Sequence, residues 1–322
     1  MKTDNGCVAF QSGAPPNKGG TFSNNIVDGS DRTGTSGSNA VCYGIYHDWP
    51  DEIQNNVFQD LVNPLVGGAN SDGHSEVSGN LINNCLSSAG GANHNNCVES
   101  FFGGTVYIHD NVINMNNPNN AGETMFLGTA GETDYIWNNI IYNITGNGPE
   151  TEFRDGTVSQ YWYNNTIVNI VGGNCIGSTG SDAASHVTVI NNHCIGGGLP
   201  SNGGVYSASN NITQSAAQAD SNSSPHFDQY TSLQAFVYGP VVTTNSTVGA
   251  GANLTTGASW PPFSTNSTNY ACIAESVNGV MQVVCPAKGA VGRPTSGPWD
   301  VGAYLLTGQA PDAPTNLQAS VQ

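Results

Sequence analysis

The sequence predicts an all-β protein built as a parallel β-helix of about eight coils. Three observations lead to this fold class: a repeat with a period of about 20 to 30 residues, strand-like alternation inside each repeat, and a turn-rich composition. Of the 322 residues, 41 are glycine and only 9% are charged. Runs of good helix formers are missing, which excludes a helical bundle. The hydrophobic content of 37% argues against disorder.

A pair of asparagines, or its equivalent, marks each repeat, as in YIWNNIIYN (135–143) and YWYNNTIVN (161–169). The second members of the pairs are Asn25, Asn56, Asn80, Asn111, Asn139, Asn165, Asn192 and Asn211. Leucine-rich repeats would need a Leu-x-x-Leu-x-Leu frame, which the chain lacks. A coil of short strands for each period is therefore expected, with loops of variable length at the corners.

Two columns of apolar residues flank the marker asparagines and are expected to face the core. The column three residues before the marker contains Phe22, Ile53, Val77, Ile108, Ile136, Trp162 and Val189. The column two residues after it contains Val27, Phe58, Ile82, Ile113, Ile141 and Ile167. The markers themselves should stack at about 4.8 Å per coil and form a ladder of side-chain amides.

The eight cysteines indicate an oxidising, extracytoplasmic environment, because their number is even and none forms a CxxC pair. Proximity in the sequence suggests the disulfides Cys85–Cys97, Cys175–Cys194 and Cys272–Cys285, which leaves Cys7–Cys42. No apolar run approaches about 18 residues, so membrane insertion is not expected. The start, MKTDNGCVAF, lacks the apolar core of a signal peptide and is interpreted as a mature or trimmed N-terminus. The expected location is secreted or cell surface.

The charge balance restricts the class of partner. Six basic residues face 23 acidic ones, for a net charge of −17. Such a surface repels nucleic acid and anionic membranes. Neutral polymers and metal cations suit it better.

The segment GRPTSGPWDVGAYLLTG (292–308) carries a resemblance to a known group of proteins. Its Arg293, Pro294, Asp300 and Gly302–Tyr304 resemble the ending of many bacterial solenoids. Together with the repeats, the chain resembles the secreted, right-handed parallel β-helix proteins of the pectate-lyase-like superfamily. That superfamily includes polysaccharide lyases, hydrolases, epimerases and structural members, so the resemblance implies a fold and not one function.

The expected organisation has three parts. Residues 1–215 form the coils, and residues 216–308 form a non-repeating segment that packs on the solenoid or caps it. Residues 309–322 form a linker. The final APDAPTNLQASVQ resembles the start of a fibronectin-type-III module, which implies further modules in a longer parent chain.

An aromatic stripe is expected on the outward positions before three successive markers. It consists of Tyr107, His109, Tyr135, Trp137, Tyr161 and Tyr163. Exposed aromatic patches of this size commonly bind a ligand, and rings with polar tips suit sugars, so these six residues are the predicted substrate-binding residues. The alternative is that loops or the C-terminal segment cover the stripe and that the rings only stabilise the sheet. Asp110 is interpreted as a turn residue without a special role.

A second candidate site is acidic and lies earlier in the same coils. The predicted catalytic residues are His94, Glu99, Glu123, Glu150, Glu152 and Arg154. Carboxylates on adjacent coils would be about 5 Å apart, as retaining glycoside hydrolysis requires. Arg154 would orient a carboxylate or neutralise a uronate. The alternatives are a Ca²⁺ site and simple turn capping or surface pairing.

Metal candidates complete the prediction. They are Asp72, His74, Glu76 and Asp155, with Ca²⁺ as the possible cofactor. The functional expectation is a carbohydrate-active protein that binds a polysaccharide and cleaves it, as a hydrolase or a lyase. The alternative is a non-catalytic glycan-binding module or a structural, adhesin-like module.

Overall fold

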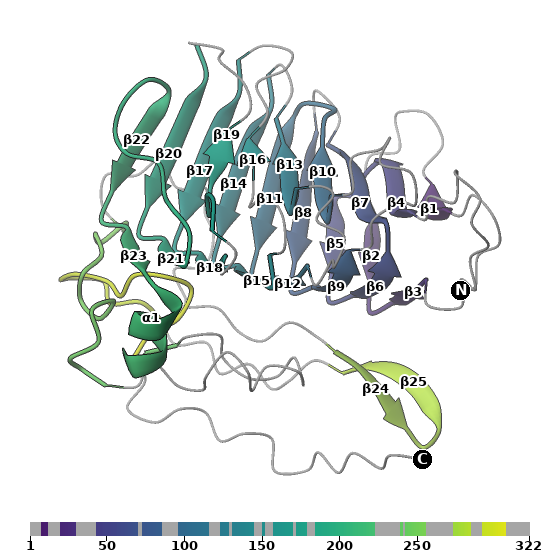
Figure 1. Cartoon of the computed structure of the whole chain (residues 1–322). Helices are drawn as coiled ribbons and strands as arrows, with labels where there is room; N and C mark the ends of the chain where they lie inside the picture. Colours follow the sequence, from purple (N-terminus) through teal and green to yellow (C-terminus); the bar gives the residue numbers. More distant parts are fainter. Residues whose placement is uncertain are drawn as a thin grey trace.

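The computed structural model shows a solenoid of parallel β-strands (Figure 1). The structure describes residues 8–11, 20–29, 43–69, 73–85, 96–115, 123–128, 131–144, 150–151, 157–169, 172–178, 184–222, 239–240, 242–255, 273–284 and 292–306. Three parallel sheets, named A, B and C, run along the solenoid and contain seven, eight and eight strands. Each marker asparagine lies between a strand of sheet B and the following strand of sheet C, so all eight repeats contribute to both sheets.

The strands are short, and their order in space follows their order in the chain. Sheet A contains β1 (Val8–Gln11), β4 (Tyr43–Asp48), β7 (Asn63–Gly68), β10 (Val98–Ser100), β13 (Met125–Leu127), β16 (Glu150–Thr151) and β19 (Gly177–Ser178). Sheet B contains β2 (Thr21–Ser23), β5 (Glu52–Gln54), β8 (His74–Ser78), β11 (Thr105–His109), β14 (Thr133–Trp137), β17 (Ser159–Tyr163), β20 (His186–Ile190) and β22 (Tyr206–Ser209). Sheet C contains β3 (Ile26–Asp28), β6 (Val57–Leu61), β9 (Leu81–Cys85), β12 (Val112–Asn114), β15 (Ile140–Tyr142), β18 (Thr166–Val168), β21 (His193–Ile195) and β23 (Ile212–Gln214).

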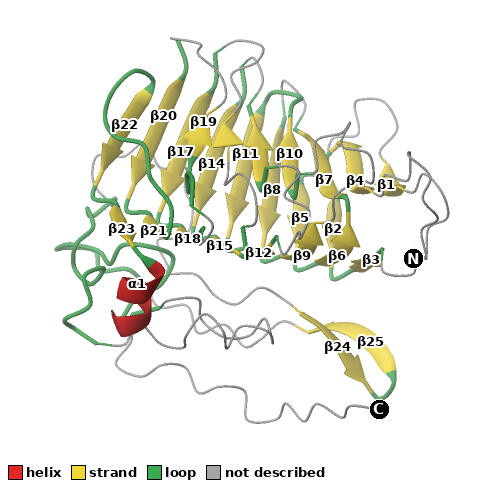
Figure 2. Ribbon diagram, viewed as in Figure 1, coloured by secondary structure: helices red, strands yellow, loops and turns green. Residues whose placement is uncertain are grey.

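Other regular structure is limited in the described part of the chain. Helix α1 (Ala216–Asn222) follows the last strand of sheet C (Figure 2). Strands β24 (Ile273–Val277) and β25 (Val280–Val284) form an antiparallel hairpin. Among the described residues, no helix is both long enough and apolar enough to cross a membrane.

The core confirms the two predicted apolar columns. Residues such as Ile53, Ile108 and Trp162 of sheet B, and Phe58 and Ile113 of sheet C, are fully buried in one continuous cluster. Alternation along each strand places every second side chain inside the solenoid. The hydrophobic effect of this continuous core is the main stabilising contribution.

The marker asparagines form the predicted ladder, and Asn139 illustrates its chemistry. Its side-chain amide nitrogen donates to the side-chain oxygen of Asn165 at 3.0 Å and to the carbonyl of Ile108 at 2.8 Å. Its own side-chain oxygen accepts from the backbone N–H and the side-chain amide of Asn111, at 3.1 and 3.0 Å. The coil-to-coil bonds repeat from Asn25 to Asn211. Each turn is thus hydrogen-bonded directly to the next.

The residue before each marker has a left-handed backbone. The φ values are between 52° and 64° for Asn24, Asn55, Gly79, Asp110, Asn138, Asn164, Asn191 and Asn210. Asn, Asp and Gly are the residues that tolerate this region best. The requirement explains why the first position of the pair is restricted to these three types.

A polar cluster interrupts the apolar interior near its middle. Asp134 and Glu132 are fully buried, and the hydroxyl of Ser100 donates to Glu132. The side-chain amide of Gln160 donates to Asp134 at 2.9 Å and to the carbonyl of Leu127 at 3.1 Å. Burial raises the pKa of Asp134 well above its ordinary value, and the neighbouring Glu132 raises it further. Asp134 therefore retains its proton at pH values where an exposed carboxyl is ionised.

The C-terminal clasp, defined here as residues 242–255 and 292–306, packs on the turns between sheets B and C. Arg293 is buried, and its guanidinium donates to the carbonyls of Asp300, Gly302 and Ala303 and to the side-chain oxygen of Asn138, at 3.0–3.3 Å. The carboxylate of Asp300 accepts from the backbone N–H groups of Gly249 and Leu306, at 2.8 and 2.6 Å. The Arg-Pro…Asp-x-Gly-Ala-Tyr segment therefore has a structural role.

The clasp also bonds directly to the coils. Gly302 N–H donates to the carbonyl of Asn191 at 2.7 Å, and Ala303 N–H donates to the hydroxyl of Thr166 at 3.0 Å. The side chain of Asn191 accepts from the N–H of Ala252 and donates to its carbonyl. Together with the bond from Arg293 to Asn138, these contacts fix the clasp against three successive repeats.

Two of the predicted disulfides are confirmed. They are Cys85–Cys97 and Cys175–Cys194, and all four half-cystines are buried. The other predicted pairs, Cys7–Cys42 and Cys272–Cys285, lie outside the described residues. The two confirmed bonds are compatible with an extracellular protein.

Candidate functional site

The six predicted aromatic residues occupy the outward face of sheet B in direct register. One row consists of Tyr107, Tyr135 and Tyr161, named here the outer row. The second row consists of His109, Trp137 and Tyr163, two residues further along the same strands. The alternation of strand residues that fills the core on one side produces both rows on the other.

The C-terminal clasp covers the second row. Trp137 and Tyr163 are only 2% and 3% exposed, and they pack in one cluster with Leu254 and Trp299 of the clasp. Burial raises the pKa of the Tyr163 phenol far above its ordinary value. The sequence left open whether the stripe was free or covered, and for these two rings the structure shows that it is covered.

The outer row is half-buried, and its rings stack on one another. The centroids of Tyr107 and Tyr135 are 5.5 Å apart with an interplanar angle of 23°, and those of Tyr135 and Tyr161 are 4.8 Å apart at 10°. Burial raises the pKa of Tyr135, and the two neighbouring phenols contribute. Three phenols thus form one column across three adjacent strands.

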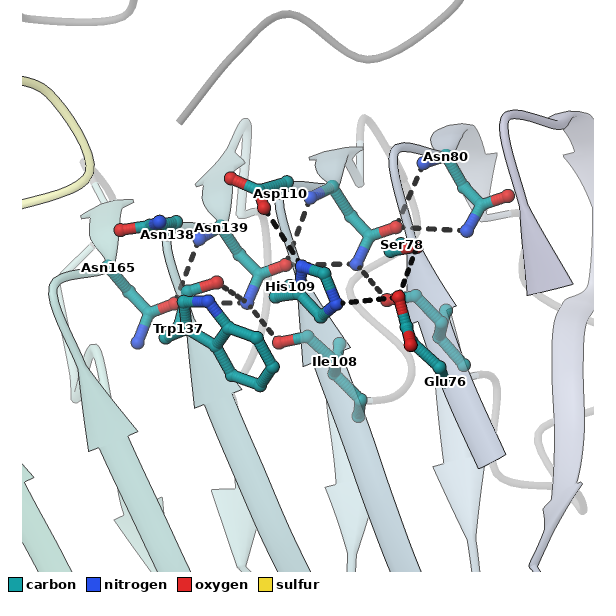
Figure 3. A network of polar contacts seen from close by, with 12 residues as sticks. Glu76, Ser78, Asn80, Ile108, His109, Asp110, Trp137, Asn138, Asn139 and Asn165 are labelled. Atoms are coloured by element: carbon teal, nitrogen blue, oxygen red, sulfur yellow. Dashed lines mark hydrogen bonds and ion pairs between the residues drawn. The ribbon is translucent and has the colours of Figure 1, made fainter. Parts of the chain in front are cut away.

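His109 lies at the centre of a polar network beside the outer row (Figure 3). Its Nε2 is 3.0 Å from Glu76 Oε1, its Nδ1 is 2.8 Å from Asp110 Oδ2, and its ring stacks on Trp137 at 4.0 Å. Burial alone would lower the pKa of His109, but the hydrogen bonds to Asp110 and Glu76 outweigh burial and raise it. The hydrogen bond from His109 in turn lowers the pKa of Glu76. The arrangement favours an imidazolium held between two carboxylates.

Asp110 therefore does more than the sequence suggested. It occupies the left-handed turn position, as expected, with φ of 53°. It also accepts the hydrogen bond from His109, which the interpretation as a plain turn residue missed. Asparagine, which most repeats have at this position, is neutral and could not form a charge-assisted hydrogen bond with His109.

A pair of carboxylates continues the outer row on the preceding strands. Glu52 and Glu76 are register partners on β5 and β8, and Glu76 is in turn the partner of Tyr107. Glu52 Oε2 accepts from the hydroxyl of Thr21 at 2.8 Å and from the amide of Gln54 at 2.6 Å. In the sequence, both glutamates stand four residues before a marker asparagine, as the tyrosines of the outer row do. This shared spacing is the signal that could have included Glu52 in the predicted site.

The predicted acidic cluster on sheet A is not brought together as expected. Glu99 pairs with Val66 and Phe126, and Phe126 separates it from Glu150 in the register. Glu123 lies before strand β13, where its N–H donates to the side chain of Asn96. The expectation that these carboxylates occupy adjacent positions is therefore wrong for Glu99, Glu123 and Glu150. His94, Glu152 and Arg154 lie outside the described residues.

The described part of the chain does not support the predicted metal site. Asp72 and Asp155 lie outside it. His74 is exposed and approaches the edge of Tyr107, with ring centroids 6.4 Å apart, while Glu76 belongs to the network of His109. Within the described ranges, no three His, Cys, Asp or Glu side chains are grouped so that they could hold a metal ion.

The geometry combines a column of phenols, a register pair of carboxylates and the imidazole of His109 on one face of sheet B. Such groups donate and accept hydrogen bonds over a length of several strands. Comparison of the chain with protein-family models, with curated proteins and with solved structures found no match.

Proposed function

We propose that this protein is an extracellular carbohydrate-binding β-helix, with the binding surface on the outward face of sheet B. The observation that carries the proposal is the unbroken register from Glu52 and Glu76 to the outer row of tyrosines. The resemblance to the pectate-lyase-like superfamily and to the start of a fibronectin-type-III module supports a secreted polysaccharide-binding protein within a longer chain.

The chemistry of this face favours a neutral glycan. Phenol hydroxyls and carboxylates are hydrogen-bonding partners for sugar hydroxyls. The described strands of sheet B contain neither Lys nor Arg, and the chain has a net charge of −17. A polyanion would be repelled from this face.

A binding panel tests the proposal. Purified protein is titrated with neutral and acidic polysaccharides, and affinity is measured by calorimetry or affinity electrophoresis. Replacing the outer row, Tyr107→Ala with Tyr135→Ala and Tyr161→Ala, is expected to abolish binding. Tyr46→Ala is the matched control, since Tyr46 is a half-buried tyrosine on sheet A. Equal loss in the control, or full binding by the triple variant, would contradict the proposal.

Cleavage of the bound glycan is a second proposal, supported by the register pair Glu52–Glu76. Adjacent strands are about 4.8 Å apart, close to the carboxylate separation of retaining glycoside hydrolases. Glu76, whose pKa is lowered by the hydrogen bond from His109, suits the ionised nucleophile, which leaves the acid–base role to Glu52.

Release of reducing ends measures this activity. Glu76→Gln and Glu52→Gln should each abolish product formation and leave binding intact. Glu99→Gln, on sheet A, is the control and also tests the predicted acidic cluster. Activity lost only in Glu99→Gln would place the chemistry on sheet A instead.

A further inference from the structure

We infer that the two ends of the solenoid bind each other, so that copies of this chain associate head to tail. One end is the first coil, residues 8–11 and 20–29, and the other is the last coil, residues 199–214. Figure 1 shows β2 and β3 at one end of the solenoid and β22 and β23 at the other. The partner is a second copy of this chain, because the hydrogen-bonding groups of one end match those of the other. The inference is independent of the proposed function.

The asparagine ladder has a direction, because each marker donates to the next marker along the chain. The backbone N–H and the side-chain amide of Asn165 both donate to the side-chain oxygen of Asn192, at 3.1 and 2.9 Å. Asn25 donates to Asn56 in the same way, but no described residue donates to the side-chain oxygen of Asn25. Asn211 accepts from Asn192, while its own N–H has no acceptor in the described part of the chain. The ladder therefore ends in an open acceptor on the first coil and an open donor on the last.

The backbone at the two ends is complementary in the same sense. Inside the solenoid, the residue after a marker donates its N–H to the carbonyl of the preceding marker, as from Ile212 to Asn192 at 2.9 Å. Ile26 holds this position on β3, an edge strand of sheet C, and Asn211 carries the matching carbonyl beside β23, the opposite edge strand. In the register of the interior coils, Asn211 of one copy would donate to Asn25 and accept from Ile26 of the next copy.

The apolar core is incompletely covered at the same two ends. The apolar side chains that pack against the main core cluster while only partly buried are Phe10, Phe22, Leu199, Val205, Tyr206 and Ala208. All of them belong to the first or the last coil. Phe22 and Ala208 both stand three residues before a marker, so the interior register would place a large ring of one copy beside a small side chain of the other. Contact between the ends would therefore bury apolar surface as well as pair the ladder.

The end rungs of the ladder are accessible to a second copy. The interior markers from Asn56 to Asn192 are fully buried, whereas Asn25 and Asn211 are half-buried. The clasp bonds to the outer side of the last corner, where the amide of Asn210 donates to the carbonyl of Ala250 at 3.3 Å. The clasp thus contacts the residue before the last marker and leaves the marker itself half-buried.

The ends also avoid the repulsion that opposes association of an acidic protein. The chain has a net charge of −17, and like charges keep copies apart. Residues 199–214 contain no charged residue, and Asp28 is the only charged residue of segment 20–29. In the interior register, Asp28 would lie beside the neutral Gln214, because both stand three residues after a marker. Two copies can therefore approach end to end with little repulsion between the contacting coils.

The product of this contact is an open chain of copies. An interface between two different surfaces is heterologous and can be repeated. Each added copy continues the parallel sheets along the solenoid axis, so rods and not closed rings are expected. In sedimentation velocity, the average mass of the parent protein should rise with concentration and exceed that of a dimer. A monomer at every concentration, or a dimer that grows no further, would overturn the inference.

Cysteines placed across the contact test its register. Ser23 and Ser209 each stand two residues before a marker, so their Cα atoms would lie about 4.8 Å apart, within the range of a disulfide. A mixture of the single variants Ser23→Cys and Ser209→Cys should form a 23–209 disulfide on oxidation, identified by peptide mass spectrometry.

Ser207→Cys is the matched control for the cross-link, because Ser207 lies two residues earlier on the same strand. Its Cα atom would be about 8 Å from that of Ser23, too far for a disulfide. Its yield with Ser23→Cys should be at least about fivefold lower than that of Ser209→Cys. Equal yields would contradict the register, and a dominant 23–23 disulfide would show that like ends meet.

Variants blocked at one end test the head-to-tail direction. Asn25→Ala removes the open acceptor and is expected to weaken self-association at least about 10-fold. Ala208→Lys places a charge at a core-facing position of the last coil, which opposes pairing of an edge, and should abolish it. An equimolar mixture should form dimers and nothing longer, because each variant retains the end that the other lacks.

Val280→Lys is the matched control for the added charge, because Val280 is 61% exposed on the β24–β25 hairpin. Its association should equal that of the parent protein. Undiminished rods from both end variants, or dimers of Ala208→Lys alone, would overturn head-to-tail contact. Circular dichroism of each variant checks that the solenoid is intact, and the cross-link between Ser23→Cys and Ser209→Cys decides the question if an end variant fails to fold.

Discussion

The two asparagines of each pair are neighbours in the chain but have opposite roles. Asn139 is fully buried and bonds to Asn111 and Asn165 in the ladder. Asn138 has a left-handed backbone with φ of 54°, and its side-chain oxygen accepts from Arg293 of the clasp. Identical side chains therefore connect coil to coil at one position and coil to clasp at the next.

The difference shows that backbone conformation assigns the role. A left-handed residue turns the chain sharply, so two successive side chains leave on different sides of the corner. The second position of each pair, called here the inner position, uses the full hydrogen-bonding capacity of an amide, which both donates and accepts. The first position of the pair is called the outer position. At the outer position Asp110 and Gly79 are also found, because there the backbone is the main requirement.

Breaking the ladder should have the largest effect. Asn139→Ala removes the bonds to Asn165, Ile108 and Trp137 and leaves the backbone N–H and the side-chain amide of Asn111 without their acceptor. The free energy of unfolding is expected to fall by about 5 kcal/mol, at about 1 kcal/mol for each lost bond. Urea unfolding followed by circular dichroism measures it. A loss no larger than that of an outer-position variant would contradict the assigned roles.

Breaking the clasp should have a smaller and more local effect. Arg293→Met removes the guanidinium that joins Asp300, Gly302 and Ala303 to Asn138. We expect a loss of about 2 kcal/mol and faster proteolysis of the clasp, with the strand signal of the solenoid retained. Limited proteolysis with mass spectrometry checks this expectation. Simultaneous loss of clasp and solenoid would mean that the clasp is part of the core.

Replacing the buried acid Asp134 by an amide should stabilise the folded protein. The pKa of Asp134 is raised in the folded state. The protonated carboxyl therefore contributes fully to the free energy of unfolding below the unfolded pKa of about 3.9. This contribution is lost as the pH rises through the folded pKa. Asp134→Asn resembles the protonated acid and keeps an acceptor for Gln160. At pH 7 it should stabilise the fold by on the order of 1 kcal/mol.

The pH dependence provides the control for this variant. Thermal unfolding of parent protein and Asp134→Asn should converge towards acidic pH, where the parent carboxyl is protonated. Asp60→Asn removes a carboxylate from a left-handed turn outside the interior cluster and should not reproduce the stabilisation. Equal stability of the Asp134 variant and the parent at pH 7 would indicate that burying the Asp134 carboxyl does not destabilise the folded protein.

Glycine at the outer position should have the smallest effects. It keeps the left-handed backbone, as Gly79 does, and removes only the side chain. Asn191→Gly loses two bonds to Ala252 of the clasp and should cost about 1 kcal/mol. Asn24→Gly removes a side chain that donates an exposed hydrogen bond to the hydroxyl of Ser23, and it should change the free energy of unfolding by less than about 0.5 kcal/mol. Equal effects at both positions would show that the clasp bonds contribute nothing.

Much of the solenoid was predictable because each coil repeats the same local chemistry. Ile108, Asn111 and Ile113 recur at the same offsets in other repeats, so their roles follow from periodicity. The disulfide Cys85–Cys97 joins the last residue of β9 to the residue before β10, and proximity in the sequence was sufficient to suggest it.

The candidate site was predictable only in part. The outer row follows from alternation, but the cover over Trp137 depends on residues far away in the chain, such as Trp299. The expected carboxylate pairing on sheet A failed because the register places Phe126 between Glu99 and Glu150. The pair Glu52–Glu76 lies instead on sheet B, where the nearby asparagine markers fix the register.

The clasp has a consequence for the order of folding. Its bonds join residues up to 155 positions apart, as in Arg293 with Asn138, whereas the ladder joins residues 19 to 31 positions apart. Contacts between distant residues close late because they must first overcome the entropy of a long loop. Coils can therefore assemble one on another during synthesis, while the aromatic second row remains uncovered until residues 292–306 have been made. A chain paused at that stage would expose Trp137 and Tyr163, which makes the unclasped solenoid the species most prone to aggregate.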